Sequence, residues 1–318
     1  MFAAVFPGQG SQKPGMGQGL YEQGGPARAA FDEISAATGI DLARLCFESD
    51  EETLRRTENA QIALYTCGVA AWKELEPHLG TLAPQAMAGH SVGEYAALAC
   101  AGVVSVSDGA RLVQRRGEIM AASGKERPGS MAAVLGLESG ELEAVCSETS
   151  TSGSVVVIAN DNCPGQLVVS GDAAAVGRAG ELAIARGAKR VLPLNVSGAF
   201  HSPLMDKSAV QMADALAAAD FRQSSVPVVS NVTAEAVMTP SLWPDLLERQ
   251  LRSTVRWTES VRSMLGMGIA VFVECGSGEV LSGLLRRIER EATPLTVNDK
   301  ESIEATINAL TEQKAGAA

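Results

Sequence analysis

The five residues Gly89-His90-Ser91-Val92-Gly93 constrain the fold more than any other part of the chain. They match the G-x-S-x-G pattern, in which a strand turns sharply into a helix and a serine stands at the turn. Glycines flank the serine because side chains there would collide across the turn. Ser91 would then lie at a helix N-terminus, where N–H groups stabilise a developing negative charge. The pattern predicts a strand–turn–helix unit and acyl transfer through a serine ester.

The size and composition of the chain favour an α/β protein. Its 318 residues exceed the usual size of a single core, and 32 glycines with only 4% aromatic residues suit close packing of helices on a sheet. The formal net charge of −11 argues against nucleic acid as a partner, because sequence-independent phosphate binding needs a broad basic surface. The N-terminal residues have no basic flank, and no apolar run approaches the length that spans a membrane. We expect a soluble, cytoplasmic protein without a membrane partner.

The cysteines indicate neither disulfides nor a metal site. They are widely scattered, without a C-x-x-C pair or a histidine at ligand spacing. We expect reduced and mostly buried thiols at Cys46, Cys67, Cys100, Cys146, Cys163 and Cys275.

Hydrophobic periodicity in the first half of the chain predicts helices that cover a sheet. An apolar opening strand is followed by helical patterns, and the composition changes to that of a connector at 123–129. The predicted helices cover 29–45, 60–75 and 105–120, with Gly102 ending the helix that follows Ser91.

The element order after the connector predicts a second, smaller domain. Residues 131–194 read as strand, helix, strand, strand, helix, strand, the βαββαβ order of a ferredoxin-like fold. After residue 195 the larger pattern resumes, with strands at 226–230 and 270–274. We therefore predict a large hydrolase-like α/β domain formed by 1–127 and 195–318 and an inserted small ferredoxin-like domain at 128–194. A cleft between two domains is a common place for a ligand.

A general base for Ser91 must be sought among only three histidines. His78 lies at a polar helix end, which favours simple exposure. His90 adjoins Ser91, but neighbours across a tight turn point apart, so packing or hydrogen bonding is the better interpretation. His201 lies in the loop that returns to the large domain, at the predicted cleft, and an imidazole suits both removal and return of a proton. The sequence therefore predicts a Ser91–His201 pair.

A third member of the pair is not evident from the residues. Glu94 and Asp206 are near in sequence only, and Glu94 is better placed in the first turn of its helix, where a carboxylate suits the dipole. A main-chain carbonyl could orient the imidazole instead.

Six short blocks give nearly the whole chain a resemblance to a known family. The chain resembles the malonyl-CoA:acyl-carrier-protein transacylases of bacterial fatty-acid synthesis, whose relatives include the acyltransferase domains of polyketide synthases. The blocks that carry the resemblance are Phe6–Gln12, Gly89–Tyr95, Arg116-Gly117, Asn162–Gln166, Gly198–Ser202 and Arg249–Leu251.

The resemblance implies roles for the residues of the reacting centre. Ser91 is the nucleophile, His201 is the base, and the main-chain carbonyl of Gln250 orients the imidazole. The backbone N–H groups of Gln9 and Val92 form the oxyanion hole.

The resemblance also implies the residues that select the substrate. Arg116 pairs with the free carboxylate of a malonyl group, which a guanidinium fork matches in geometry. Phe200 crowds an α-methyl branch, a contact worth about 1–3 kcal/mol. Asn162 is assigned to substrate binding, although the neighbouring Cys163 replaces the serine common in that block. Arg111 and Arg115 are interpreted as a solvated helix face, with CoA phosphate contacts as the weaker alternative.

The implied reaction has two half-reactions and two partners, malonyl-CoA and an acyl carrier protein. Malonyl-CoA acylates Ser91, and the phosphopantetheine thiol of the carrier then takes the malonyl group, without a metal or other cofactor. Lys189-Arg190 and Arg286-Arg287 are basic pairs that could meet an acidic carrier. Two alternatives stay open: a serine thioesterase or hydrolase that uses water as acceptor, and a noncatalytic CoA- or carrier-binding module.

Overall fold

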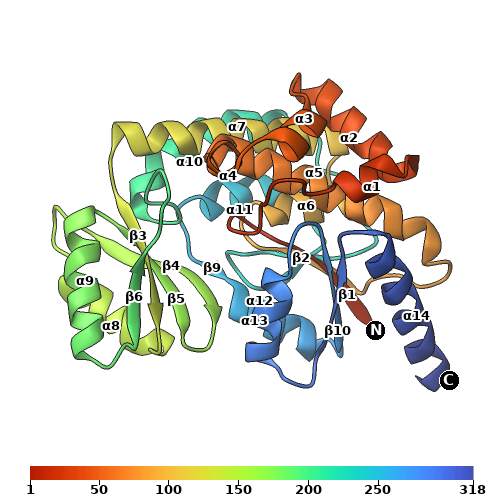
Figure 1. The fold of residues 1–318 in the computed structure, drawn as a ribbon. Helices are drawn as coiled ribbons and strands as arrows, with labels where there is room; N and C mark the ends of the chain where they lie inside the picture. Colours follow the sequence, from red (N-terminus) through yellow and green to blue (C-terminus); the bar gives the residue numbers. More distant parts are fainter. Residues whose placement is uncertain (318) are drawn as a thin grey trace.

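The structure is a computed structural model that describes residues 1–317, with side chains to residue 313. Within this range the chain is a mixed α/β protein with two β-sheets. Figure 1 shows the smaller sheet at one end of the molecule and both chain termini at the other.

The larger sheet is mainly parallel. Its strands are β1 (Phe2–Phe6), β2 (Ala86–Gly89), β7 (Val228–Val229), β8 (Ala236–Val237), β10 (Val271–Cys275) and β11 (Thr293–Val297). They lie in the order β11-β10-β1-β2-β7-β8, and only the β7–β8 pair is antiparallel. The carboxyl ends of β1 and β2, at the centre of the sheet, lead into the opening glycine-rich loop and the Ser91 turn.

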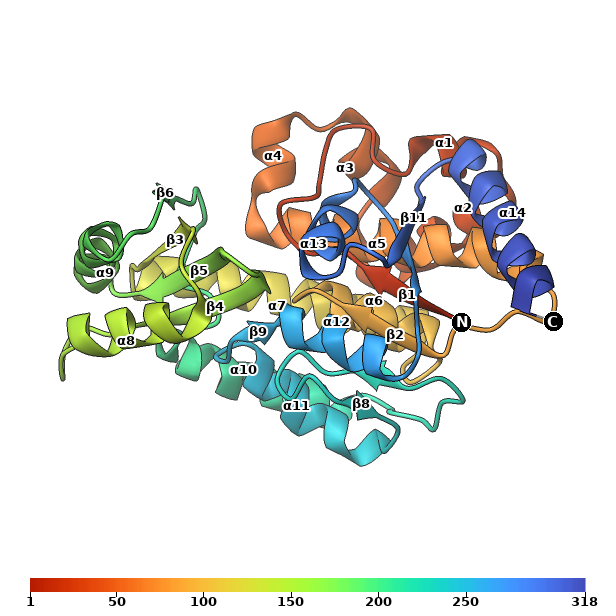
Figure 2. The same ribbon diagram turned by 90° about the horizontal axis from the view of Figure 1, so that it is seen from below.

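Helices surround the larger sheet, as the two views in Figures 1 and 2 show. They are α1 (Gln18–Glu22), α2 (Gly25–Thr38), α3 (Leu42–Glu48), α4 (Glu51–Arg55), α5 (Thr57–Leu75), α6 (Gly93–Cys100), α7 (Val106–Glu126), α10 (Asp206–Ala218), α11 (Trp243–Gln250), α12 (Trp257–Gly266), α13 (Val280–Ile288) and α14 (Lys300–Ala317), with short 3₁₀ turns η1 (Glu76–His78), η2 (Pro203–Met205) and η3 (Pro240–Leu242). None of the described helices combines the length and apolarity needed to cross a membrane.

The central strand β1 explains why both faces of the sheet are covered. Phe2, Ala4 and Phe6 belong to one hydrophobic core, which includes α5 and α6. Ala3 and Val5 belong to another core on the opposite face, with apolar residues of α12 and α13. Side chains alternate along a strand, so a strand buried on both faces is apolar throughout.

The smaller sheet has its own core and one strand from elsewhere in the chain. Its elements are β3 (Ser130–Leu135), α8 (Ser139–Thr149), β4 (Val156–Cys163), β5 (Gln166–Gly171), α9 (Ala173–Ala185), β6 (Arg190–Pro193) and β9 (Val255–Arg256). The strand order is β6-β3-β5-β4-β9, antiparallel except for the β4–β9 pair. The first six elements lie where the sequence predicts strands and helices. The sequence did not predict β9, which attaches the segment after α11 to the smaller sheet.

Two predictions of local structure were wrong. The single helix predicted over 29–45 is two helices, because Gly39 adopts a left-handed φ of 71° and ends α2, while Asp41 caps α3 by accepting from the N–H of Arg44. The connector predicted at 123–129 is mostly helical, because α7 continues to Glu126. Gly124 in this last part of α7 permits the close approach of the 197–198 backbone, since a Cβ there would lie 1.5 Å from the carbonyl oxygen of Ser197.

Backbone contact between β1 and the strand-to-helix turn of residues 89–93, the elbow, holds Ser91 in place. A Cβ on Gly93 would lie 2.1 Å from the carbonyl oxygen of Phe6, and a Cβ on Gly89 would lie 1.9 Å from the carbonyl carbon of Gly93. Glycine is therefore required at both positions, as the G-x-S-x-G pattern predicts.

We expect Gly93→Ala to destabilise the protein by about 3 kcal/mol or more, because the added methyl group forces β1 and α6 apart. Gly177→Ala is the matched control: Gly177 lies in α9 with open space at its Cβ position, so alanine should leave stability unchanged or raise it by up to about 1 kcal/mol. Urea unfolding measures both effects. Equal stability of the two variants would contradict the role of the backbone contact.

Candidate active site

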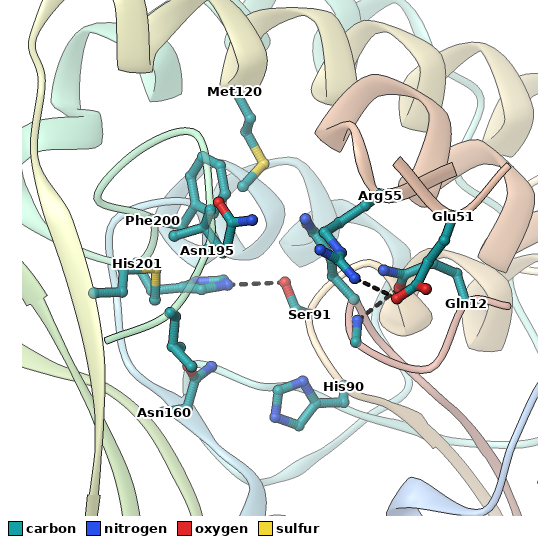
Figure 3. A pocket seen from close by; sticks show the side chains of 15 residues that line it. Gln12, Glu51, Arg55, His90, Ser91, Met120, Asn160, Asn195, Phe200 and His201 are labelled. Atoms are coloured by element: carbon teal, nitrogen blue, oxygen red, sulfur yellow. Dashed lines mark hydrogen bonds and ion pairs between the residues drawn. The ribbon is translucent and has the colours of Figure 1, made fainter. Parts of the chain in front are cut away.

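A cavity of about 360 Å³ lies beside Ser91, between the smaller sheet and the loops that follow β1 and β2 of the larger one. Met131 of β3 and Asn160 of β4 line one side, and Met120 of α7 lines another. The remaining lining residues are Gln9, Gly10, Gln12, Glu51, Arg55, His90, Ser91, Leu194, Asn195, Val196, Phe200 and His201. Figure 3 shows Ser91 and His201 facing one another across this space.

The Ser91 hydroxyl and the His201 ring form a direct hydrogen bond. Ser91 Oγ lies 2.8 Å from His201 Nε2, and His201 Nδ1 lies 2.8 Å from the carbonyl oxygen of Gln250. A carbonyl oxygen can only accept, so Nδ1 carries the hydrogen of the neutral ring. His201 Nε2 then accepts the hydrogen bond that Ser91 donates, which is the arrangement a general base needs.

Both partners are held in unusual backbone conformations. Ser91 has a φ of 53° and His201 a φ of 56°, in the left-handed region that non-glycine residues rarely adopt. Asn231 fixes the Ser91 turn, because its Oδ1 accepts from Ser91 N–H at 2.7 Å and its Nδ2 donates to the Gly89 carbonyl at 2.7 Å. His201 N–H donates to the carbonyl oxygen of Leu251 at 3.0 Å. These contacts maintain the strained turns.

The guanidinium group of Arg116 is buried beside the nucleophile. Its side chain is 1% exposed; Nη2 donates to Ser91 Oγ at 3.0 Å and to Gln250 Oε1 at 2.9 Å, while Nη1 donates to Gln61 Oε1 at 2.5 Å. Among the described side chains, no carboxylate lies within 4.0 Å of its nitrogens, and Nε has no hydrogen-bond partner. Glu94 interacts with this charge only through space, and a buried cation that no carboxylate contacts directly favours the entry of a negatively charged ligand group.

Among the groups of this site whose pKa values burial shifts, His201 and Glu94 bear most on the chemistry. Burial, and secondly the charge of Arg116, lower the pKa of His201 to about 3, so the imidazole is neutral at ordinary pH. Burial raises the pKa of Glu94 to about 7 despite the hydrogen bonds that its carboxylate accepts.

The residues predicted for the oxyanion hole and for selectivity occupy different positions around the cavity. Gln9 and Phe200 line the cavity, and Val92 directly precedes α6. In the described part of the chain, the N–H groups of Gln9 and Val92 donate to no other group, so both donors are available. Asn162 is not among the lining residues; its Oδ1 lies 2.8 Å from His90 Nε2, and Asn160 lines the cavity instead.

The structure also places the groups that were interpreted as structural. His90 is buried and hydrogen-bonded, and His78 is exposed in η1, as predicted. Arg111 pairs with Asp108 on an exposed face of α7. All six cysteines are free and buried, as predicted.

Sequence reasoning missed three polar residues of this site: Gln61, Glu94 as a buried group, and Asn231. Asn231 follows a predicted strand next to the elbow strand, and carboxyl ends of adjacent parallel strands meet at one edge of a sheet. That position was the available signal for Asn231. Gln61 lies in a helix with the pattern of a core element, which gave no signal for a polar role.

Comparisons with known proteins agree with one another. The family model described as "Acyl transferase domain" matches residues 3–301. The malonyl CoA-acyl carrier protein transacylase of Bacillus subtilis is 42% identical over 311 residues, which cover 98% of each chain. The chain belongs to the malonyl CoA-acyl carrier protein transacylase family.

Solved structures of the same family have the same fold. An acyl carrier protein S-malonyltransferase from Vibrio cholerae matches with a TM-score of 0.92 and 41% identity, over 96% of this chain and 99% of that one. A malonyl-transacylase solved in complex with a type II PKS acyl-carrier protein matches with a TM-score of 0.92 and 39% identity, over 97% and 99% of the two chains.

We expect Arg116→Ala to raise the pKa of His201, because the substitution removes a positive charge and admits water beside the ring. NMR titration of the His201 ring measures the shift. Arg111→Ala, on the exposed face of α7, should leave the His201 titration unchanged. An unchanged His201 pKa in Arg116→Ala would contradict the electrostatic coupling.

Proposed function

We propose that this protein transfers a malonyl group from malonyl-CoA to the phosphopantetheine thiol of an acyl carrier protein through a malonyl ester of Ser91. One observation carries the proposal: Ser91 Oγ is hydrogen-bonded both to a neutral imidazole and to a buried guanidinium that no carboxylate contacts directly. The first contact suits serine ester formation, and the second suits an acyl group that ends in a carboxylate. The names of the relatives support the same reaction.

The first half-reaction begins with removal of the Ser91 proton by His201 Nε2. The Ser91 oxygen attacks the thioester carbonyl, and the resulting oxyanion would be stabilised by the N–H groups of Gln9 and Val92. The Gln250 carbonyl accepts from His201 Nδ1–H and stabilises the positive ring that forms. Because the pKa of His201 is low, the ring readily gives its proton to the departing CoA thiolate.

The second half-reaction repeats these steps with the carrier thiol as nucleophile. His201 removes the thiol proton, the sulfur attacks the Ser91 ester, and the proton returns to Ser91 Oγ. Thioester exchange is nearly balanced in energy and needs only a base and oxyanion donors. We therefore propose that no metal or organic cofactor takes part.

Arg116 and Phe200 would select the acyl group. The malonyl carboxylate would accept hydrogen bonds from Arg116 in the space beside Ser91, supplying the anion that the buried guanidinium lacks. Phe200 is 4% exposed and lines the cavity, so its ring would limit branching next to the carbonyl. Asn162 would act indirectly, by holding His90 at the cavity wall.

We propose that the two basic pairs form one docking face for the carrier. Arg287 donates to Gln166 Oε1 at 2.5 Å and to the Pro164 carbonyl at 3.3 Å. Gly165 in the same turn accepts from Gly136 N–H at 2.9 Å, and Lys189 N–H donates to the carbonyl of Leu135, next to Gly136, at 2.7 Å. These contacts bring the segments that carry both basic pairs close to the same turn, which supports one docking face that would suit an acidic carrier.

The finer domain description is also a proposal. The order β6-β3-β5-β4 supports an inserted ferredoxin-like domain at 128–194 within a hydrolase-like domain at 1–127 and 195–318, of which residue 318 lies outside the described residues. Because β9 joins the smaller sheet, the two parts share a strand and should move little relative to one another. The reduced state of all six cysteines supports a cytoplasmic location.

We expect intact-protein mass spectrometry to detect one malonyl adduct on the wild-type protein after mixing with malonyl-CoA, and none on Ser91→Ala. Addition of a phosphopantetheinylated carrier protein should discharge the adduct to the carrier much faster than water does. Absence of any adduct would favour a noncatalytic binding module. Release of free malonate as fast as the carrier is loaded would favour the thioesterase alternative.

A further inference from the structure

Glu94 is a buried carboxylate that the mechanism above does not use. It lies in the first turn of α6, three residues after Ser91, and is 1% exposed. Its Oε1 accepts from the main-chain N–H of Asn231 at 2.9 Å, and its Oε2 accepts from the side-chain amide of Gln250. It therefore connects two residues that contact the reacting groups.

The amide of Gln250 has an orientation that Glu94 helps to define, together with the Ser91 carbonyl and Arg116. Gln250 Nε2 donates to Glu94 and to the Ser91 carbonyl at 3.0 Å, and Oε1 accepts from Arg116 Nη2 at 2.9 Å. An ionised carboxylate can only accept, so the NH₂ end of the amide must face Glu94. The oxygen end is then left facing Arg116.

We propose that Glu94 is a positioning residue that holds the Arg116 guanidinium beside Ser91 through the side chain of Gln250. This inference rests on the proposed malonyl transfer and adds a residue that determines its acyl selectivity. Without the carboxylate, the NH₂ group of Gln250 would lose one of its two acceptors. A donor in that place would favour the reversed amide, whose NH₂ group faces the donors of Arg116. The guanidinium would then move away from the position at which it meets the malonyl carboxylate.

The second contact of Glu94 serves the nucleophile turn. Asn231, whose N–H donates to Glu94, also holds Ser91 N–H and the Gly89 carbonyl through its side chain. One carboxylate thus aligns the turn that presents Ser91 and the amide that presents Arg116.

If Glu94 acts through its charge, malonyl transfer must depend on pH, whereas a role in packing alone predicts no such dependence. Burial raises its pKa to about 7; the charged and titratable groups around it are Arg116 from α7 and Tyr95 from α6, while Ser230, Asn231 and Gln250 are uncharged. His201, beyond Gln250, is neutral above a pKa of about 3. Protonated Glu94 has a donor end, like glutamine, and no longer fixes the Gln250 amide. Malonyl transfer should therefore fall as the pH drops below 7.

The raised pKa of Glu94 also means that its ionised carboxylate does not add to the stability of the folded protein. The folded pKa exceeds the unfolded value of 4.5, so the native state binds the proton more tightly than the unfolded chain. Ionisation of Glu94 therefore lowers the free energy of unfolding as pH rises from about 4.5 to about 7, and the loss remains above that range. Glu94→Gln should consequently gain stability relative to wild type over this interval.

The experiment compares wild type with Glu94→Gln. It measures the single-turnover rate at which malonyl-CoA and acetyl-CoA acylate Ser91 between about pH 5.5 and 8.5. The melting temperature of each protein is measured as well. At pH 8 we expect Glu94→Gln to acylate with malonyl about tenfold more slowly and with acetyl far less affected, because Arg116 is displaced. The wild-type malonyl rate should fall toward the variant's rate below pH 7, and the variant's profile should be flat there. Glu274→Gln is the matched control, since Glu274 is another buried carboxylate that accepts main-chain N–H groups, at the start of α13.

The outcomes separate this inference from the proposed function. An unmodified wild-type Ser91 would refute malonyl transfer itself. Normal wild-type acylation with an unchanged malonyl-to-acetyl ratio in Glu94→Gln would overturn the positioning role alone. Equal losses for both acyl groups with a lowered melting temperature would make Glu94 structural. If Glu94→Gln does not fold, the wild-type profile decides: the inference fails unless an acid limb near pH 7 affects malonyl more than acetyl.

Discussion

The buried charge of Arg116 is the constraint on which the rest of the site depends. A guanidinium removed from water needs an anion or a full set of acceptors, and the described residues offer only Gln61, Gln250 and the Ser91 hydroxyl. The Tyr95 ring, with its centroid 5.6 Å from the guanidinium carbon, adds a favourable π-face. Burial, with the charge of Arg116 as a second cause, lowers the pKa of His201 and keeps the ring neutral, and the same charge leaves a place for a substrate carboxylate. Arg116 thus contributes both to the acyl selectivity of the site and to the low pKa of its base.

Local sequence patterns predicted the parts of the fold that local physics determines. The elbow glycines, the stop at Gly102 with its φ of 78°, and the helix that begins after Ser105 follow from steric and capping rules that act within a few residues. The structure also brings Ser91 and His201 within 2.8 Å, although 110 residues separate them. That pairing was predictable because the chain has only three histidines, and two of them lie where exposure or packing accounts for an imidazole.

The remaining features depend on contacts that no local pattern encodes. Glu94 looked like a first-turn carboxylate, yet it is buried because Asn231 and Gln250, from distant segments, supply its hydrogen bonds. The strand β9 has only two residues and exists because β4 offers a free edge. The wrong helix over 29–45 shows the opposite case: Gly39 and Asp41 were local stop and start signals that the apolar periodicity obscured.

The measurement that tests the role of the buried charge most directly is the rate at which Ser91 is acylated by malonyl-CoA and by acetyl-CoA in wild type and in Arg116→Ala. If the buried guanidinium receives the substrate carboxylate, the substitution slows malonyl acylation and speeds acetyl acylation, so the preference of the protein shifts toward acetyl. Equal losses for both acyl groups would contradict this role, because Arg116 would then serve only the structure of the site.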